Sequence, residues 1–470
     1  MKIMLWKHGV IDDTTGELPH AGLGILARDI LEAGHEVFIA DYHFDPGLEH
    51  SAAELLAIEK PDILCASLVS LGWLLPETQA VLDAAFAMGI PIWIGGPHVS
   101  AYWDLLAGDR RFSKIIIGEC DRRFREILAS PDRVIRFGLA EAIQRPDFSV
   151  LMSAEKMISY PVFTSRGCNY NCCFCASTKL HGNRWRPRPL DDVFWNELDE
   201  LEAKYPKLER IAVTDDAFTT DLDHAMAFLD GYIRRGYPYK VSVFNVRADQ
   251  INRPFLDRLK YLGLEELSIG VDGVDGDVLR YMRKGETLET IWRAVALIQE
   301  AGLIPRLNMI IGLPGDTPEA HSRAVDIVSR VPKPRVTQWL HYAPFRGTWA
   351  YKYFVERGDF PDGFIAPSGS ARFEETPAPG LFDAKDFSRQ EKRLAQMEAY
   401  LRCHSPILIF NEAEVVSLCQ RHGMMAYYED WRRNAPIDHF LNVVVPNKLA
   451  KGQLSAPPKI AAAGEPAQAS

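Results

Sequence analysis

The sequence predicts an α/β protein with two units, followed by a helical region. Short apolar strands alternate with amphipathic helices over the first 130 residues, and the same alternation returns from residue 160 to about 344. Such alternation favours parallel sheets, because each crossover between parallel strands needs a helix. A third observation is the change in composition after residue 350, which sets the last part of the chain apart.

The first unit, residues 1–130, is expected to form a doubly wound, Rossmann-like domain. Gly22 and Gly24 open an amphipathic helix, and Gly34 ends it as a C-cap. Ligands of such domains bind at the carboxyl ends of the strands. The expected strands are 1–6, 36–40, 63–68, 92–95 and 114–117, a further helix spans 76–88, and the loops at the strand ends are 67–70, 95–98 and 118–119.

The second unit, residues 160–350, is expected to form a partial (β/α)6 barrel. Residues 131–159 precede it, contain Pro131 and Pro146, show little periodicity and are predicted to be a linker. A barrel of this kind carries its chemistry at the C-terminal rim of its strands. The expected barrel strands are 160–164, 209–214, 240–246, 266–270, 306–311 and 337–342.

Composition and charge exclude several classes of protein. A net charge of −10 and a pI near 5.8 argue against a nucleic acid as partner, since phosphate binding needs a basic face. No apolar run reaches the length of a membrane span. Eight cysteines in 470 residues do not make a disulfide framework, and the N-terminus has no signal-peptide features, so a reducing, cytoplasmic location is expected.

Three cysteines, Cys168, Cys172 and Cys175, are the most informative residues. A cubane 4Fe–4S cluster offers four irons to thiolates, and this spacing supplies three thiolates from one short loop, which leaves one iron open. A structural zinc site is disfavoured because no second C-x-x-C or histidine pair follows at a suitable distance. Cys173 breaks the spacing and is expected to be a bystander, with a ligand swap as the alternative. Ordinary buried thiols are expected at Cys65, Cys120, Cys403 and Cys419.

The cysteine loop, with Phe174 directly before its last cysteine, resembles the signature of the radical S-adenosylmethionine (SAM) superfamily. The resemblance implies that the open iron chelates the amino and carboxylate groups of SAM. An electron from the cluster would then cleave SAM to methionine and a 5′-deoxyadenosyl radical. An electron donor such as flavodoxin or ferredoxin is implied as a partner.

The strand ends of the second unit resemble the SAM-binding segments of this family. Arg247 can pair with the SAM carboxylate, and Asp272 stands where the family has a glutamate that meets the ribose. Residues 312–315 resemble the turn after the adenine-contacting strand, and Arg346 is a substitution at the substrate mouth. Asp215 or Arg247 could instead form a structural ion pair. The implied SAM contacts are Phe174, Asp215, Asp216, Asn245, Arg247, Ser268, Asp272, Asn308 and Ile310.

The first unit resembles the cobalamin-binding domain that precedes many radical SAM domains. The resemblance rests on residues 22–24, 33–37, 95–98 and 118–119, whose glycines would let the backbone approach the corrin. The implied cobalamin contacts are Gly22, Ser67, Leu68, Val69, Gly95, Gly96, Pro97, His98 and Glu119.

The axial histidine motif of other cobalamin proteins is broken in this chain. Asp41 and His43 begin it, but Pro46 stands in place of its glycine. His43 is therefore expected at the surface and His98 in a loop that lines the nucleotide tail, so cobalamin would bind base-off with no protein histidine on cobalt. The alternative is a degenerate domain that holds no cofactor.

The resemblance covers residues 1–350 and implies a cobalamin-dependent radical SAM enzyme. Most such relatives methylate an unactivated carbon of a small-molecule substrate through methylcobalamin. The alternatives are cyclisation, rearrangement or transfer of another SAM-derived group such as aminocarboxypropyl, and, in a different class, a non-catalytic sensor that binds the cluster or the corrin. In relatives the region after the barrel caps it, which implies a capping role for residues 351–445 of this chain. Residues 446–470 are expected to be disordered. Trp349, Tyr351, Tyr353 and Phe354 could line a pocket or belong to the core.

Overall fold

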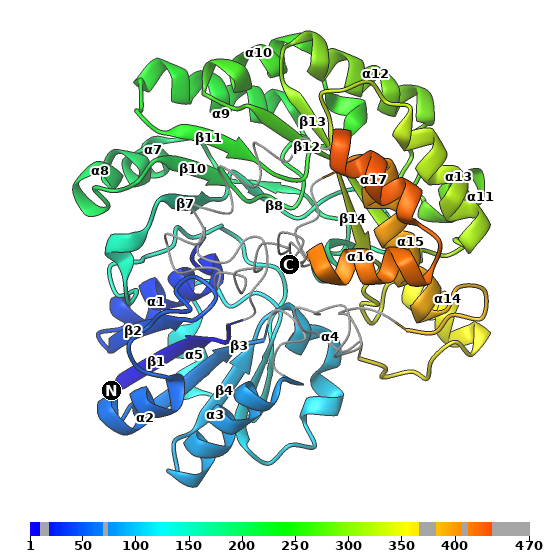
Figure 1. The fold of residues 1–470 in the computed structure, drawn as a ribbon. Coiled ribbons are helices and arrows are strands. Elements are labelled where there is room, and N and C mark those ends of the chain that lie inside the picture. Colours follow the sequence, from blue (N-terminus) through cyan, green and yellow to red (C-terminus); the bar gives the residue numbers. More distant parts are fainter. Residues whose placement is uncertain (10–17, 69–73, 366–381, 406–411, 435–470) are drawn as a thin grey trace, which may run out of the picture.

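The computed structural model describes residues 1–9, 18–68, 74–365, 382–405 and 412–434. Within these ranges the N-terminal sheet lies below an arch of strands and helices formed by the second unit (Figure 1). None of the described helices is long and apolar enough to cross a bilayer. The predicted disordered tail at 446–470 lies outside the described residues.

The first unit is a six-stranded parallel sheet with helices on both faces, which confirms the predicted fold class. Alternate side chains of β1 enter two cores: Ile3 and Leu5 pack on the side of α1 and α5, and Met4 and Trp6 on the side of α2 and α3. The strand order is β2-β1-β3-β4-β5-β6. The strands are β1 (Lys2–Lys7), β2 (Glu36–Asp41), β3 (Ile63–Ser67), β4 (Ile92–Gly95), β5 (Phe112–Ile117) and β6 (Val134–Arg136), and the helices are α1 (Ala21–Glu32), α2 (Ala52–Glu59), α3 (Pro76–Ala87), α4 (Pro97–Leu106) and α5 (Phe124–Ala129).

The predicted linker is more structured than its sequence suggests. Its first part forms β6 at the edge of the sheet, beside β5. Its later part runs along β2, where Ile39 N–H donates to Val150 O at 2.9 Å and Met152 N–H donates to Ile39 O at 3.0 Å. Phe148 packs against Gly24, at which an added Cβ would lie 2.7 Å from the ring, so α1 needs a glycine there.

The second unit is a partial barrel of six parallel strands, as predicted. Its halves, β11-β10-β7 and β12-β13-β14, meet at a parallel bridge between Val246 and Ile269. On β13, Leu307 and Met309 are buried on the outer side, so Asn308 between them faces the interior of the barrel. The strands are β7 (Ser159–Val162), β10 (Arg210–Val213), β11 (Lys240–Val243), β12 (Glu266–Asp272), β13 (Ile304–Ile311) and β14 (Val336–His341), and a hairpin is formed by β8 (Ser165–Arg166) and β9 (Arg186–Pro187).

Helices cover the outer side of the barrel strands (Figure 1). On α12, Ile291, Ala294, Val295 and Ile298 recur with helical spacing and enter the core, which is the pattern of an amphipathic helix. The helices are α6 (Ala176–His181), α7 (Asp192–Asp199), α8 (Leu201–Lys204), α9 (Leu222–Arg235), α10 (Arg253–Tyr261), α11 (Gly276–Met282), α12 (Leu288–Glu300), α13 (Pro318–Ser329) and α14 (Trp349–Arg357), and 3-10 turns occur at Ala154–Lys156 and Ala248–Gln250.

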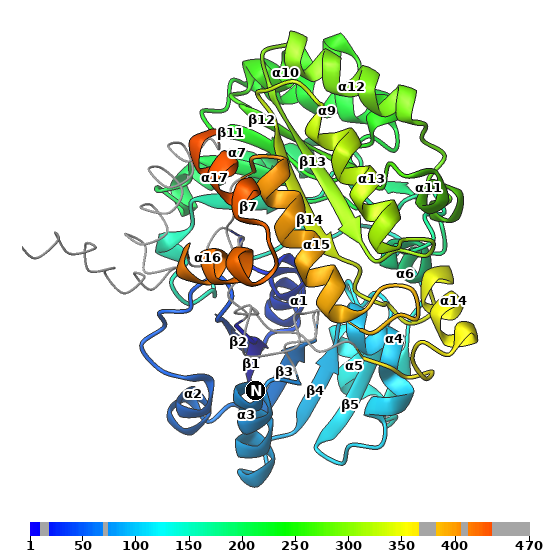
Figure 2. The same cartoon turned by 45° about the vertical axis from the view of Figure 1, so that its right-hand side comes forward.

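The C-terminal region contributes three helices, α15 (Arg389–Arg402), α16 (Glu412–Arg421) and α17 (Met425–Asn434). Figure 2 shows α15 alongside β14 and α13. Gln396 Nε2 donates to Trp339 O at 2.6 Å, and Trp339 N–H donates to the Tyr400 hydroxyl at 3.2 Å. This helix therefore packs on the outer face of the last barrel strand, and the predicted capping role of residues 351–445 stays a prediction.

Candidate active site

The three predicted cluster cysteines lie on the loop between β8 and α6, and each is partly exposed. The loop starts at Gly167, whose φ is +83°. A Cβ at this position would lie 2.1 Å from Arg184 O, so the turn accepts only glycine. The backbone ahead of Cys168 is therefore fixed by both conformation and close packing.

Cys173 is a core residue. It is 2% exposed and packs with Met282 and Tyr342, and Phe174 packs against the edge of the same cluster. Its N–H donates to Met282 O at 2.9 Å, and its carbonyl accepts from Ala350 N–H at 2.9 Å. This position supports the predicted bystander role, while the ligand set itself stays a prediction.

Asp215 and Asp216, just after β10, accept hydrogen bonds from the residues that lead into the cysteine loop. Asp215 is fully buried and accepts hydrogen bonds from Thr164 N–H at 2.8 Å, Thr164 Oγ1 at 2.6 Å and Ser165 Oγ at 2.5 Å. Asp216 Oδ2 accepts from Gly167 N–H at 2.7 Å. Both residues were predicted to face SAM, and the structure instead places their carboxylates under the loop.

Asn245 and Arg247, at the end of β11, are also engaged with their surroundings. Asn245 adopts a φ of +55° and donates from Nδ2 to Asp215 O at 3.0 Å. Arg247 donates from Nε and Nη2 to the two oxygens of Asp249, both at 3.0 Å. Its guanidinium carbon lies 3.5 Å from the ring centroid of Tyr170, within the cysteine loop. The arginine fork predicted for the SAM carboxylate is thus occupied by a protein carboxylate.

The other predicted SAM contacts share the inner faces of β12 and β13. Asn308 Nδ2 donates to Ser268 Oγ at 2.8 Å, and Asn308 Oδ1 has no hydrogen-bond partner among the described residues. Ile310 follows on the same face of β13. Asp272, which adopts a φ of +64°, accepts from Lys284 Nζ at 2.8 Å at the end of β12. On this face Asn308 Oδ1 is therefore a buried acceptor without a partner among the described residues, and Asp272 is paired with Lys284.

Lys284 is a site residue that motif analysis did not single out. Its side chain is 6% exposed and lies between Asp272 and Glu286, with Nζ 2.8 and 2.9 Å from their carboxylates. Burial lowers the pKa of Lys284, but Asp272 and Glu286 outweigh burial and raise this pKa above its ordinary value. Its place two residues after Met282 and directly before Gly285 was the only signal that the local sequence offered.

The ends of β3 and β4 form one continuous rim on the first unit. Leu68 N–H donates to Gly95 O at 2.9 Å, and His98 N–H donates to Leu68 O at 3.2 Å. Gly96 has a φ of +109°, and a Cβ there would lie 3.1 Å from Leu68 O. Pro97 then begins α4. These predicted cobalamin contacts are brought together, with backbone rather than side chains at the two glycines.

A histidine that sequence analysis missed lies beside this rim. His20 caps α1 by accepting from Leu23 N–H at 3.1 Å, and its Nε2 lies 3.4 Å from Ser67 Oγ. Burial, the largest effect, lowers the pKa of His20 to about 4. A Cβ at Gly22 would lie 2.9 Å from His20 Cε1. Val69, also a predicted contact, lies outside the described residues.

The turn after β14 docks onto α4 of the first unit. The ring of His98 meets Phe345 edge-on, with centroids 6.2 Å apart. Arg346 binds Asp104 at 2.5 Å and Asp362 at 3.0 Å. Arg346 was predicted at the substrate mouth, and the structure shows that its guanidinium instead joins the two units.

Glu119 likewise joins the two units. It follows β5 at the predicted corrin rim, but its carboxylate accepts from His181 Nδ1 at 2.9 Å, Arg186 Nη2 at 2.5 Å and Ala140 N–H at 2.6 Å. The predicted corrin contact therefore has its side chain directed at the second unit. Distant partners of this kind leave no local signal in the sequence.

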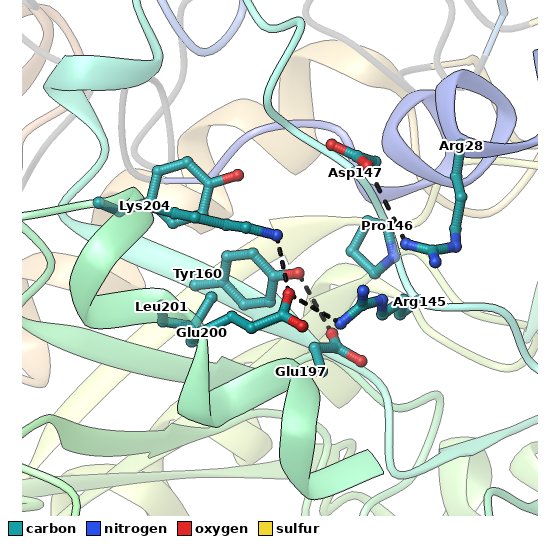
Figure 3. Close-up of a pocket in the computed structure, with 10 residues that line it drawn as sticks. Arg28, Arg145, Pro146, Asp147, Tyr160, Glu197, Glu200, Leu201 and Lys204 are labelled. Carbon is teal, nitrogen blue, oxygen red and sulfur yellow. Dashed lines mark hydrogen bonds and ion pairs between the residues drawn. The ribbon is translucent and has the colours of Figure 1, made fainter. Parts of the chain in front are cut away.

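Two pockets lie near the junction of the units. Figure 3 shows one of about 10 Å³, the size of one water, at which Glu200 binds Arg145 at 3.1 Å and Lys204 at 2.8 Å. It is too small for a ligand. The other, of about 250 Å³, has Gly118 and Leu180 in its lining and lies between the β5 loop and α6.

The cysteine loop offers three partly exposed thiols, which is the donor type that a cubane cluster takes. Burial, the largest effect, raises the pKa of the Cys172 thiol to about 12, and Lys284 lowers it. Thr220 Oγ1 donates to Cys168 Sγ at 4.0 Å. Among the described residues no three histidine, cysteine or acidic side chains converge on a single metal ion, which is a smaller group than a cubane.

The inner face of the barrel and the loop after β4 are the regions predicted to hold SAM and the corrin. The free Asn308 Oδ1 on the inner face of the barrel offers a buried acceptor to a ligand. At the other rim, a Cβ at Gly96 would lie 3.1 Å from Leu68 O, so the loop after β4 packs closely on the end of β3 and needs a glycine there.

Comparisons with known proteins agree with both units. The model of the radical SAM superfamily matches residues 162–327, and that of the B12 binding domain matches residues 7–128. An uncharacterized methyltransferase of Pyrococcus horikoshii is 24% identical, covering 73% of this chain and 79% of the relative. The bacteriochlorophyllide d C-12(1)-methyltransferase of Chlorobaculum tepidum is 25% identical, covering 59% and 62%.

Solved structures share the fold of nearly the whole chain. The radical SAM methyltransferase TsrM from Kitasatospora setae, with tryptophan substrate and a SAM analogue bound, has a TM-score of 0.63 at 17% identity, covering 93% of this chain and 90% of TsrM. The cobalamin-dependent SAM radical enzyme OxsB, with aqua-cobalamin and SAM bound, has a TM-score of 0.63 at 15% identity, covering 91% and 72%. The matched models give the chain an N-terminal B12-binding domain and a radical SAM domain, so it is a radical SAM enzyme whose cofactors are a 4Fe–4S cluster, SAM and cobalamin.

Proposed function

We propose that this enzyme methylates an unactivated carbon of a small-molecule substrate, with cobalamin as the carrier of the methyl group. When bound, the cluster and SAM supply a 5′-deoxyadenosyl radical that can take hydrogen from such a carbon. The observation that carries the proposal is the contact between the two predicted cofactor rims. His98 on the corrin side lies against Phe345, which is four positions beyond the end of the last barrel strand, so the rims share one junction.

The roles of the chain's own residues divide along this junction. Cys168, Cys172 and Cys175 would hold the cluster, and the inner face of β12 and β13 would hold SAM. Asp272 would accept from the ribose hydroxyls, and Asn308 would use its free Oδ1 as an acceptor. The cobalamin contacts would be those of the rim at β3 and β4.

The barrel interior supports a substrate with both apolar and polar parts. Leu340 on the inner face of β14 is 44% exposed, and Phe244 after β11 is 36% exposed, although both are large apolar side chains. Asn308 and Ser268 lie across the interior on neighbouring strands. The names of the relatives point the same way, since they include a bacteriochlorophyllide methyltransferase and a methyltransferase with bound tryptophan.

Cyclisation or rearrangement is a second candidate within the same chemistry. It is favoured by one observation, a relative named anaerobic magnesium-protoporphyrin IX monomethyl ester cyclase from Rubrivivax gelatinosus, which is 25% identical over 46% of this chain and 39% of the relative. Methyl transfer is preferred because the relatives that cover more of the chain are methyltransferases.

The test is anaerobic reconstitution with iron, sulfide and hydroxocobalamin, followed by reduction with flavodoxin or ferredoxin in the presence of SAM labelled with a CD3 group. If the enzyme transfers a methyl group, metabolite extracts offered as substrate should give 5′-deoxyadenosine and a product that carries three deuterium atoms. That product is about three mass units heavier than the one formed from unlabelled SAM. Release of 5′-deoxyadenosine with only unlabelled products would favour the cyclase alternative. Absence of 5′-deoxyadenosine from a protein with a full cluster would refute both.

A further inference from the structure

Glu119 lies at the centre of a charged cluster that joins the two cofactor loops. The cluster consists of Glu119 and Asp121 from the first unit and Arg166, His181, Arg186 and Asp216 from the second. We call it the junction cluster. Glu119 Oε1 accepts from His181 Nδ1 at 2.9 Å and from Arg186 Nη2 at 2.5 Å, and Oε2 accepts from Arg186 Nη1 at 2.8 Å.

The partners of Glu119 lie on both sides of the cysteine loop. Arg166, which directly precedes Gly167, lies 3.5 Å from Glu119 and donates to both oxygens of Asp121, at 2.9 and 3.1 Å. His181 ends α6, which follows the last cysteine. Arg186 lies opposite Arg166 on the β8-β9 hairpin. One carboxylate therefore contacts the residues before the loop, after it and beside it.

A second path leads from Glu119 to the start of the loop. His181 Nε2 lies 3.5 Å from Asp216 Oδ2, and the same oxygen accepts from Gly167 N–H at 2.7 Å. On its other side, Glu119 is bonded to Gly118, whose φ is +87° and at which a Cβ would lie 2.1 Å from Phe137 O. The backbone around Glu119 is therefore tightly packed as well.

The electrostatics of the cluster favour a rigid arrangement. The side chain of Glu119 is 11% exposed, as is that of Arg166, and that of Arg186 is 17% exposed. Burial raises the pKa of Glu119, but His181 and Arg186 outweigh it and hold that pKa well below its usual range. Charge-assisted, bidentate hydrogen bonds in a poorly hydrated site are strong and directional, so they fix distances between the elements they join.

We propose that Glu119 is a positioning residue that sets the distance between the corrin rim and the cluster loop. It touches neither cofactor. It acts through Arg166, His181 and Arg186, so that SAM held at the cluster meets the corrin at the distance that methyl transfer requires. This inference rests on the proposed function, and it gives Glu119 a role that differs from its predicted corrin contact.

Glu200 provides a matched control. It also binds two basic residues, Arg145 and Lys204, and also joins the linker to the barrel (Figure 3). Its side chain is 42% exposed, and it lies near Tyr160 at the start of β7, at the opposite end of that strand from the cysteine loop. A change of charge at Glu200 therefore tests the loss of an inter-unit ion pair away from the cofactor rims.

The experiment compares Glu119→Gln and Glu200→Gln with the wild type, each reconstituted with cluster and cobalamin. The readout is the first methyl transfer, in which the two-electron-reduced corrin takes the methyl group of SAM and S-adenosylhomocysteine leaves. Titanium(III) citrate supplies the electrons, so no substrate is needed. We expect Glu119→Gln to keep its iron, corrin and SAM affinity but to form S-adenosylhomocysteine about tenfold more slowly, because a misplacement of about 1 Å costs up to about a hundredfold and this variant keeps part of the hydrogen bonding. Glu200→Gln should match the wild type.

A second variant and a spectroscopic readout separate positioning from folding. Arg186→Lys keeps the charge but loses the bidentate geometry, so it should slow the same step to a smaller extent. The reduced cluster speeds the spin relaxation of cob(II)alamin by an amount that depends on the distance between the two cofactors. In both variants this relaxation rate should differ from that of the wild type. Wild-type rates and relaxation in Glu119→Gln would overturn the inference, as would loss of the cluster in both variants. Failure of the wild type to bind a corrin or to methylate it would instead refute the proposed function.

Discussion

The surroundings of the cysteine loop and the inner face of β12 and β13 carry similar polar residues but use them in opposite ways. Around the loop, Asp215 accepts three hydrogen bonds and Arg247 has both arms of its fork on one carboxylate. On the inner face, Asn308 keeps a free acceptor among the described residues. The first region pairs its polar groups internally, whereas the second pairs Asp272 with Lys284 but leaves one buried acceptor, Asn308 Oδ1, without a partner among the described residues. A charged residue at a strand end can therefore hold a site in place without contacting the ligand.

The largest effect is expected from the cluster cysteines. Replacement of Cys168, Cys172 or Cys175 by alanine should remove about four irons per chain and abolish SAM cleavage, because a cubane held by three thiolates cannot spare one. Iron analysis and 5′-deoxyadenosine release measure this. Cys173→Ala is the matched control and should keep both, since Cys173 is buried in the hydrophobic core. Loss of the cluster in Cys173→Ala alone would show that the ligand assignment is wrong.

A large effect on stability is expected at Asp215. Asp215→Ala leaves Thr164 and Ser165 with buried donors that lack an acceptor, which should lower the free energy of unfolding by about 3 kcal/mol or more. Urea denaturation of the variant and the wild type would measure the change. If the stability is unchanged but SAM binding is lost, Asp215 belongs to the ligand-binding region instead.

A smaller, ligand-specific effect is expected at Asp272. Asp272→Ala should weaken SAM binding by about 1.5–3 kcal/mol, the size of a lost hydrogen bond to a charged group. Isothermal titration of the reconstituted protein with SAM measures the affinity. Arg247→Ala is the informative comparison, because its guanidinium is already paired with Asp249 and its effect on SAM must act through the cysteine loop. Unchanged SAM affinity in Asp272→Ala would make this residue structural.

The smallest effect is expected where α13 packs against α15, on the outer side of the barrel, and it depends on pH. His321 on α13 is buried, its Nε2 lies 3.1 Å from Ala395 O of α15, and burial lowers its pKa from 6.5 to about 4. Because the unfolded chain binds the proton more tightly, the stabilisation is present above pH 6.5 and is lost as the pH falls toward 4. At pH 5 the loss from this residue is about 2 kcal/mol.

His321→Gln tests this sign. The variant should lose less stability than the wild type between pH 7 and pH 5, as measured by urea denaturation at both values. An equal loss in the two proteins would mean that His321 does not titrate in this range.

Both folds and the cysteine loop could be predicted from the sequence, because short-range patterns encode them. Strand and helix periodicity placed the two sheets, and the spacing of Cys168, Cys172 and Cys175 marked the loop. The glycines at 95 and 96 marked the rim of the first unit, where the structure gives a φ of +109° at the second.

The partners of the charged residues could not be predicted. Glu119 contacts Arg186 across 67 positions, and Arg346 contacts Asp104 across 242. Only the packing of the two units brings these residues together, and no local pattern records it. The same limit applies to Asp215 and Arg247: a residue at a strand end has the right chemistry for SAM, but its neighbours in space decide whether it is available.

We propose that the rim at β3 and β4 holds the corrin with no protein histidine on cobalt. The electron paramagnetic resonance spectrum of cob(II)alamin in the protein tests this claim most directly. Protein loaded with hydroxocobalamin should retain the corrin through gel filtration and give a base-off spectrum without nitrogen superhyperfine splitting, because the axial motif at His43 is broken. Splitting that disappears in His43→Ala or His98→Ala would show a histidine on cobalt, and failure to retain any corrin would contradict the account.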